Sequence, residues 1–470
     1  MYTMKAERDQ LSTAEVARQA GIHKDTLLRW LRSGVVAEPG RDRHGWRLFT
    51  RDQARSVIAL AQSTLSGPQA AETKASSTYA ERLRAIDWDF AGAKTGYLTH
   101  GIHPYPAKFI PQIPNALIQE LSSVGDTVAD IFCGSGTTLV EALTLKRHAV
   151  GIDANPLACL MSRAKTTAIS ESDALALRQL ATDMRTAGDA FALGGDGQLF
   201  PTEKFVSSAW RPESETLLFW FEPFVIEELA ECLARCRCLP TEPARTLALT
   251  SFSSIVVAVS KQDSDTRYVR REKGLSSGEV FRKFARALDV SVRAASEYSD
   301  LVEPRFRCAV VESTLLDTPE IPPIDLMVCS PPYPNAFSYH LYHMTRMLWL
   351  GMDQPRFKKE EIGSHRKYSS NGKNAATADT FKLEFEGIMT WLRDKLKKNG
   401  YACFVVGDST LKGERIDNAE IISQAGKIAG FSEVARINRT LQSTKKSFNP
   451  SIGKIKTEKI LILENCGGAS

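Results

Sequence analysis

The chain has 470 residues, of which 43% are hydrophobic and 24% charged, and its formal net charge is +5. That length exceeds one typical hydrophobic core, so we expect two or three domains, and the slight basic excess means that any nucleic-acid surface must come from local patches. No apolar run is long enough to span a membrane, and the polar start of the chain has no apolar signal segment. We therefore expect a cytoplasmic protein that neither crosses a membrane nor is secreted.

The nine cysteines are scattered along the chain, which is typical of reduced thiols in a cytoplasm. Cys232, Cys236 and Cys238 form a cluster, but no second pair of Cys or His follows them at zinc-ligand spacing. We therefore expect no metal site, and small buried residues of a helix are the simpler interpretation of this cluster.

Two short helices are predicted near the start of the chain, with a turn at Gly21 between them. Ser12 or Thr13 can cap the first helix. A hairpin with its turn near residues 44–45 follows, and then a helix from Arg51. Basic and hydroxyl side chains suited to phosphates and base edges lie on the second helix and in the hairpin: Lys24, Thr26, Arg29 and Arg47.

This segment resembles the winged helix-turn-helix of MerR-type regulators, whose wing has a similar pattern of arginine, glycine and aromatic residues. The resemblance implies a DNA-binding domain over residues 1–61 that uses the four side chains just named. A small helical module for protein contacts is the alternative. The long dimerisation helix of those regulators does not follow, so we expect an accessory DNA reader. Residues 62–84 begin with a stretch rich in Ser, Thr, Ala, Gly and Pro and are predicted to be a flexible linker.

Residues 124–153 predict a β-loop-α-β unit of a parallel sheet, with a glycine-rich turn before the helix. Gly134 and Gly136 would let the backbone approach a ligand closely, since neither has a Cβ. Asp153 ends the second strand, where it can accept hydrogen bonds from ribose hydroxyls. The G-x-G-T spacing differs from the G-x-G-x-x-G of dinucleotide-binding folds, and a purely structural turn is the alternative.

The string from Asp130 to Thr137, DIFCGSGT, resembles the cofactor loop of amino-methylating DNA methyltransferases. Residues 103–111 are similar to the segment that closes over the methionine end of S-adenosylmethionine (SAM) in that family; a Pro-rich structural loop is the alternative. Glu312 ends a predicted strand, where it can contact the SAM adenine. The resemblance thus implies SAM as the cofactor, held by these residues: His103, Pro104, Lys108, Phe109, Asp130, Phe132, Gly134, Gly136, Thr137, Asp153 and Glu312.

An apolar, strand-like run over residues 324–329 leads into Ser330-Pro331-Pro332-Tyr333, which places this tetrapeptide at the carboxyl edge of a sheet, where open α/β sheets bind ligands. Two prolines fix φ and remove two amide donors. The Ser330 hydroxyl and the Pro331 carbonyl can accept the two N–H groups of an exocyclic amine. Tyr333 can stack on the base that carries this amine.

The tetrapeptide matches the pattern [D/N/S]-P-P-[Y/F/W] of the amino-methyltransferases, so the resemblance implies that Ser330, Pro331, Pro332 and Tyr333 are catalytic. The serine form is typical of cytosine-N4 enzymes and the aspartate form of adenine-N6 enzymes. Both side chains accept hydrogen bonds, so physics alone does not separate the two bases, and adenine-N6 stays the alternative. No Pro-Cys dipeptide occurs, so the cysteine-dependent cytosine-C5 route lacks its nucleophile.

The resemblance implies direct in-line transfer of a methyl group from SAM to the N4 of cytosine in duplex DNA, after the base has been flipped out of the helix. A DNA-binding regulator with a non-catalytic methyltransferase scaffold is the alternative from a different class. Double-stranded DNA is the implied partner, joined by a companion component if the protein serves restriction–modification or defence. The sequence does not indicate an oligomeric state.

The expected fold is an α/β, Rossmann-like SAM-dependent methyltransferase sheet with a largely helical insertion, preceded by a small winged-helix domain. We expect the methyltransferase domain in two parts, residues 85–165 with the cofactor loop and residues 305–470 with the tetrapeptide. Residues 166–304 between them are the predicted insertion and our candidate for target recognition. Three basic segments are predicted to contact DNA, and solvated surface loops are the alternative for each of them. Their candidate contacts are Arg267, Arg270, Arg271, Lys358, Lys359, Arg366, Lys367, Lys445 and Lys446.

Overall fold

The computed structural model describes residues 10–20, 27, 30–31, 36–41, 47–66, 79–193, 206–265, 267–334, 337–369, 376–411, 413–441 and 457–467. The chain divides into two compact units, Met1–Arg82 and Leu83–Ser470, which are described separately. Within the described ranges, no helix combines the length and the apolar character that crossing a lipid bilayer requires.

The first unit contains a three-stranded antiparallel sheet of order β1-β3-β2. Its elements are β1 (Gln10–Ser12), α1 (Thr13–Gln19), β2 (Gly40–Arg41), β3 (Arg47–Thr50) and α3 (Arg51–Ser66). Ser12 caps α1 reciprocally with Glu15: its hydroxyl accepts from the Glu15 amide at 3.3 Å, and the Glu15 carboxylate accepts from the Ser12 amide at 2.8 Å. Val16, Phe49 and Val57 are buried in a small core.

Two helices occupy the ends of the segment that was expected to be a linker, residues 62–84. Helix α3 continues to Ser66, and α5 (Tyr79–Arg84) forms at the other end. Helix α3 extends beyond residue 62 because the first helix breakers in this stretch are Gly67 and Pro68.

The second unit is built on a seven-stranded sheet of order β13-β14-β10-β9-β4-β5-β8. Its strands are β4 (Thr127–Asp130), β5 (His148–Asp153), β8 (Cys308–Glu312), β9 (Ile324–Cys329), β10 (Leu396–Gly407), β13 (Phe431–Thr440) and β14 (Thr457–Asn465). Strands β8, β5, β4, β9 and β10 are parallel, whereas β14 is antiparallel to both of its neighbours. The predicted Rossmann-like sheet is confirmed. Its strand order reverses between β4 and β9, so the crevice at their carboxyl ends is where such sheets bind ligands.

Alternate residues of these strands enter two separate cores, one on each face of the sheet. Val128 and Val405 pack with α6 (Gln112–Leu121) and α7 (Thr137–Thr144), whereas Ala129 and Phe404 pack with α18 (Ala378–Lys395) and α19 (Asn418–Ala429). This period of two buries both faces of the sheet, and the loops at the strand ends are left to form a site.

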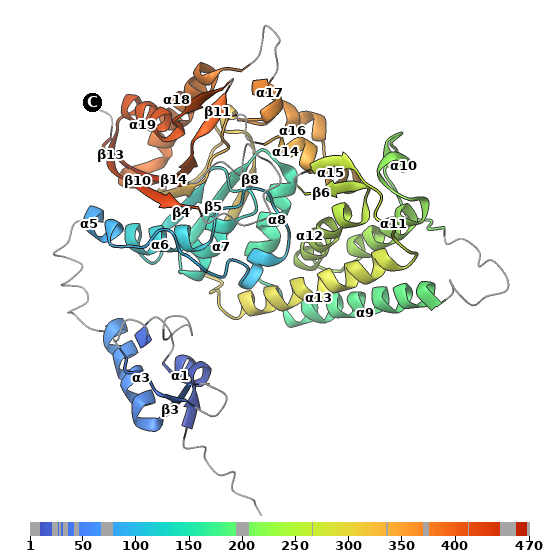
Figure 1. Ribbon diagram of the computed structural model, residues 1–470, viewed down its shortest axis with the longest axis horizontal. Coiled ribbons are helices and arrows are strands. Elements are labelled where there is room, and N and C mark those ends of the chain that lie inside the picture. The colour runs from blue at the N-terminus through green and yellow to red at the C-terminus, as the bar shows by residue number, and fades with distance from the viewer. Residues whose placement is uncertain are drawn as a thin grey trace, which may run out of the picture. The chain divides into compact units, whose positions relative to one another are not determined.

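The described residues between 166 and 304 form a helical body beside the sheet, drawn green to yellow in Figure 1. Its elements are α9 (Glu171–Leu193), α10 (Leu217–Trp220), α11 (Pro223–Arg237), α12 (Glu242–Val259), β6 (Gln262–Ser264), β7 (Arg267–Arg270) and α13 (Glu279–Ser299). Cys232 and Cys236 are buried in its core. Trp349, from a helix that follows β9 in the chain, belongs to the same core and packs edge-on against Phe252 and Phe221.

Ten further elements are described. They are α5 (Tyr79–Arg84), the 3-10 turn η1 (Leu98–Gly101), α8 (Pro156–Thr166), the 3-10 turn η2 (Leu315–Asp317), α14 (Tyr339–Tyr342), α15 (Met344–Leu350), α16 (Gln354–Glu360), α17 (His365–Ser369), β11 (Ser409–Leu411) and β12 (Glu414–Ile416). Helices α14 to α17 all follow the tetrapeptide, so the chain leaves β9 through a long helical connection before it returns in β10.

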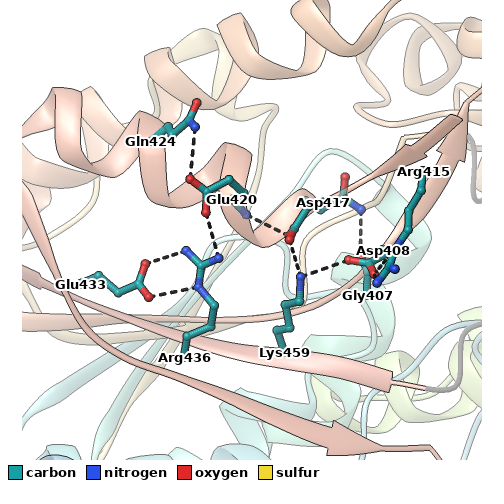
Figure 2. A network of polar contacts seen from close by, with 10 residues as sticks. Gly407, Asp408, Arg415, Asp417, Glu420, Gln424, Glu433, Arg436 and Lys459 are labelled. Carbon is teal, nitrogen blue, oxygen red and sulfur yellow. Dashed lines mark hydrogen bonds and ion pairs between the residues drawn. The ribbon is translucent and has the colours of Figure 1, made fainter.

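A network of charged side chains fastens the carboxyl end of β10 to its neighbours (Figure 2). Asp408, directly after β10, pairs with Arg415 of β12 and with Lys459 of β14, and Lys459 also contacts Asp417 at the start of α19. Arg436 of β13 extends the network. Exposed ion pairs contribute little one by one, but a shared network fixes the relative positions of the elements that it joins.

Candidate active site

One cleft at the switch point brings the glycine loop and the tetrapeptide together. It has a volume of about 780 Å³, including its open mouth. Ser330 and Pro332 line it from the carboxyl end of β9. Six of the predicted cofactor residues line it from the other side: Lys108, Phe109, Phe132, Gly134, Thr137 and Asp153.

Asp153 and Gly134 are joined directly, across the ends of β5 and β4. The Gly134 amide donates to one Asp153 carboxylate oxygen at 2.8 Å, and the Asn155 amide donates to the other at 2.8 Å. Burial raises the pKa of Asp153 to about 6, in spite of these two donors. The carboxylate thus shapes the glycine loop and presents its remaining lone pairs to the cleft.

Asp130 does not line the cleft, although the sequence suggested a cofactor contact. Its side chain is 1% exposed and accepts from the Phe132 amide at 3.1 Å, directly beneath the turn. Burial raises the pKa of this carboxyl to about 7. Asp130 therefore stabilises the start of the loop from behind.

Gly136 also faces away from the cleft. A Cβ on this residue would lie 2.9 Å from the Ser162 hydroxyl and 3.1 Å from the Ser162 Cα on α8, and its φ of +78° is in the left-handed region. The glycine is needed here for close packing of the loop on α8 rather than for approach to a ligand. At Gly134, the atom nearest to such a Cβ is the Cε1 of Tyr105, at 3.2 Å.

His103 and Pro104 do not line the cleft. His103 is buried, its Nδ1 contacts the Pro104 carbonyl at 2.6 Å, and its Nε2 contacts the Ser253 hydroxyl at 3.0 Å. A carbonyl only accepts, so Nδ1 carries the proton and Nε2 accepts from Ser253. The neighbouring Tyr105, which the sequence did not single out, lines the cleft instead.

Glu312 is exposed at the end of β8 and does not line the cleft. It pairs in register with Asp153, and the three residues after it, 313–315, form the adjoining part of the wall. The strand end was thus placed correctly, but the contact with the cleft is made one residue later.

The tetrapeptide is held by a single carbonyl of β10. The Ser330 hydroxyl donates to the Val405 carbonyl at 3.0 Å, and the Tyr333 hydroxyl donates to the same oxygen at 3.2 Å. Because the only hydroxyl proton of Ser330 is used in this hydrogen bond, its oxygen lone pairs can accept a hydrogen bond from a ligand. Pro331 and Tyr333 do not line the cleft, and Tyr333 anchors the loop through its hydroxyl.

Residues 357–362 complete the cleft, although the sequence marked this stretch only as a basic loop. Phe357, Glu360, Glu361 and Ile362 line the wall opposite the glycine loop. Glu361 is buried and accepts from the Tyr339 amide at 2.5 Å. The sequence signal for this part of the cleft was the pair of apolar residues, Phe357 and Ile362, within a charged stretch. Their local spacing does not show what they pack against.

The candidate DNA contacts in the second unit are exposed or paired with acids. Arg267 and Arg271 pair with Asp263, each at 3.3 Å, and Arg270 pairs with Glu272 at 2.8 Å. Lys358 and Lys359 are exposed on α16, and Lys367 pairs with Glu384 at 2.5 Å. The Arg366 side chain lies outside the described part of the structure, as do Lys445 and Lys446.

In the first unit, Arg47 on β3 pairs with Glu38 at 2.8 Å. Lys24, Thr26 and Arg29 lie outside the described residues. The predicted recognition helix therefore stays a prediction.

Two protein families match the chain. The DNA methylase family matches residues 58–163, and the MerR helix-turn-helix family of regulatory proteins matches residues 11–57. The first match includes the whole glycine loop and Asp153.

Several curated proteins are similar to parts of the chain. The type II methyltransferase M.MjaII of Methanocaldococcus jannaschii is 34% identical over 129 residues, which are 26% of this chain and 24% of that protein. The type II methyltransferase M.MvaI of Kocuria varians is 43% identical over 86 residues, which are 18% of this chain and 19% of that protein. The chain thus matches only about a quarter or less of the length of these relatives.

Among solved structures, TrmN of Thermus thermophilus aligns over 97% of this chain and 81% of its own, with 9% identity and a TM-score of 0.32. The fold assignment rests on the strand order given above. Residues 58–163 are thus similar to the DNA methylase family, and residues 11–57 to the MerR-type helix-turn-helix family.

Proposed function

We propose that this protein is a SAM-dependent DNA methyltransferase that methylates the N4 amino group of cytosine in duplex DNA. One observation carries the proposal: Gly134 and Asp153, from the glycine loop and the next strand, line the same cleft as Ser330 and Pro332. A cofactor loop and an amine-binding loop at one switch point are what a methyl transfer between two bound molecules requires. The match of residues 58–163 to the DNA methylase family supports the same reaction class.

The residues of the cleft fit SAM. Asp153 has lone pairs for ribose hydroxyls, and the Gly134 backbone lies open beside it because no Cβ intervenes. Phe109, Leu315 and Phe357 supply apolar surface for a purine ring. SAM bound there would supply an electrophilic methyl group on a sulfonium sulfur.

Ser330 would hold the amine that receives the methyl group. Its hydroxyl proton is directed to the Val405 carbonyl, so its oxygen can accept an N–H from the exocyclic amine. That hydrogen bond draws the amine nitrogen out of conjugation with the ring and orients its lone pair. Catalysis then rests on positioning, without a covalent intermediate on the protein.

Double-stranded DNA is the proposed substrate. The match of residues 11–57 to the MerR-type helix-turn-helix family supports a second DNA contact outside the catalytic unit. The choice of cytosine rests on the serine of the tetrapeptide, since the serine form is typical of cytosine-N4 enzymes.

Nucleoside mass spectrometry of unmethylated duplex DNA, incubated with the protein and SAM, tests the proposal. We expect N4-methylcytosine from the unmodified protein and a rate at least about a hundredfold lower from Ser330→Ala, because the amine loses its oriented acceptor. Ser409→Ala, just beyond β10 and away from the cleft, is the matched control and should keep full activity.

The products separate the alternatives. N6-methyladenine would retain the mechanism and overturn the choice of base. Absence of any methylated base from a protein that still binds SAM would favour the non-catalytic scaffold.

A further inference from the structure

A buried serine of the helical insertion contacts two segments that lead to the wall of the cleft. Ser253 lies on α12 and is fully buried. Its hydroxyl donates to Nε2 of His103 at 3.0 Å, and its carbonyl accepts from Nε of Arg346 at 2.9 Å. These two contacts lead to opposite parts of the same wall.

The first contact leads to Tyr105. His103 uses its other ring nitrogen to donate to the Pro104 carbonyl at 2.6 Å, which fixes the backbone directly before Tyr105. The Tyr105 ring then lies over Gly134, where it leaves only 3.2 Å for a Cβ, and it lines the cleft. The position of this ring against the glycine loop therefore depends on the orientation of His103.

The second contact leads to Tyr339. Arg346, on α15, is 0% exposed, and its guanidinium also pairs with Asp265 of the β6–β7 hairpin. One turn before it, His343 stacks on Tyr105 with ring centroids 5.3 Å apart and on Tyr339 at 6.3 Å.

Tyr105 and Tyr339 themselves stack at 5.7 Å, and both line the cleft. The wall is therefore an aromatic cluster, Tyr105–His343–Tyr339, that is held at both ends by α12.

We propose that Ser253 is a positioning residue that sets this aromatic cluster and thereby the affinity of the cleft for SAM. The inference rests on the proposed function, because it takes the cleft to be the SAM site. Helix α12 belongs to the segment that was expected to read the target, so the insertion would also build part of the cofactor site. Without the Ser253 hydroxyl, Nε2 of His103 becomes a buried acceptor without a donor, and the imidazole must turn or shift to find one.

Ser253→Ala in the full chain tests the inference, and the same helix offers a matched control. Ser251 is equally buried, but its hydroxyl donates to the Leu247 carbonyl at 2.9 Å and contacts the Ser291 hydroxyl at 2.8 Å, away from the cleft. Calorimetry with SAM in the absence of DNA should give a Kd about tenfold higher for Ser253→Ala, the size expected for one lost buried hydrogen bond. Ser251→Ala should stay within about twofold of the unmodified protein, although both variants lose a buried hydroxyl.

Kinetics separate positioning from a general loss of structure. In Ser253→Ala the KM for SAM should rise, while kcat at saturating SAM stays within about twofold, because Ser330 and its carbonyl partner are untouched. Ser253→Thr keeps the hydroxyl and should restore the affinity. Should Ser253→Ala fail to fold, Asp265→Asn is the second variant: it removes the partly exposed carboxylate charge that pairs with Arg346 and should weaken SAM binding as well.

Two results would contradict the inference alone. The first is an unchanged SAM affinity in Ser253→Ala, or in Asp265→Asn if Ser253→Ala does not fold. The second is a loss of SAM affinity in Ser251→Ala as large as that in Ser253→Ala. No SAM binding by the unmodified protein would overturn the proposed function together with this inference.

Discussion

At the scale of single residues, Gly136 shows that the glycine loop is shaped by what lies behind it. Its left-handed φ and its close approach to Ser162 both exclude a side chain, and Ser162 in turn donates to the Gly134 carbonyl at 2.9 Å. The face of the loop that meets the cleft is therefore fixed by the packing of its other face on α8.

Gly136→Ala should lower the free energy of unfolding by more than the cost of placing an alanine in a left-handed backbone conformation. The backbone contribution is about 1–2 kcal/mol, and the contact with Ser162 adds about 1–3 kcal/mol of overpacking. Gly92→Ala is the control, because Gly92 has a similar φ of +72° but no atom within 4 Å of the added Cβ. Urea denaturation of both variants measures the difference, and equal losses would show that the Ser162 contact is unimportant.

Asp153 gives the proposed SAM site a pH dependence. Burial raises its pKa to about 6, above the ordinary 3.8, so the folded protein holds more protons than the unfolded chain between these values. The contribution of this group to stability therefore falls as the pH rises through that window.

SAM affinity should change in the opposite direction, because only the carboxylate can accept freely from ribose hydroxyls. We expect Kd to increase as the pH falls below about 6, by up to tenfold per unit. Calorimetry from pH 5 to pH 8 tests this expectation, with Asp153→Asn as a variant that should show no such slope. A flat profile for the unmodified protein would count against Asp153 as a ribose ligand.

At the scale of elements, α16 presents different side chains on two faces. Phe357 is 4% exposed and lines the cleft, whereas Lys358 and Lys359 are exposed to solvent. Under the proposed function, we expect the first face to contact SAM and the second to contact DNA.

Paired variants of α16 should separate these two contacts. Lys358→Ala with Lys359→Ala should weaken duplex binding and lower the dependence of log Kd on log salt by about two, if each lysine neutralises one phosphate. SAM affinity should not change. Phe357→Ala should weaken SAM binding and leave the salt dependence intact. Fluorescence anisotropy with labelled DNA at several salt concentrations distinguishes the two, and an unchanged salt dependence in the lysine variant would exclude α16 from the DNA surface.

At the scale of the whole molecule, the sheet and the two loops at its carboxyl edge could be predicted from sequence patterns, but the rest of the cleft wall could not. The strands expected at 148–153 and 324–329 coincide with β5 and β9, because buried parallel strands are continuous apolar runs. The hydrogen bond between His103 and Ser253 joins residues 150 positions apart, and no local spacing reveals such a contact. Phe357 likewise meets the cleft because the chain after β9 passes through α14 and α15 before α16 reaches the wall.

Because Trp349 belongs to the core of the insertion, it limits how the insertion could be transplanted into another protein. The core formed by α9 to α13 is completed by a helix that the chain supplies after β9. A chimaera that grafts residues 166–304 alone would separate this hydrophobic core from Trp349 and from two smaller buried side chains, Ile102 and Ala164. The transferable module is therefore discontinuous, and a working graft must carry α15 together with the helices that surround it.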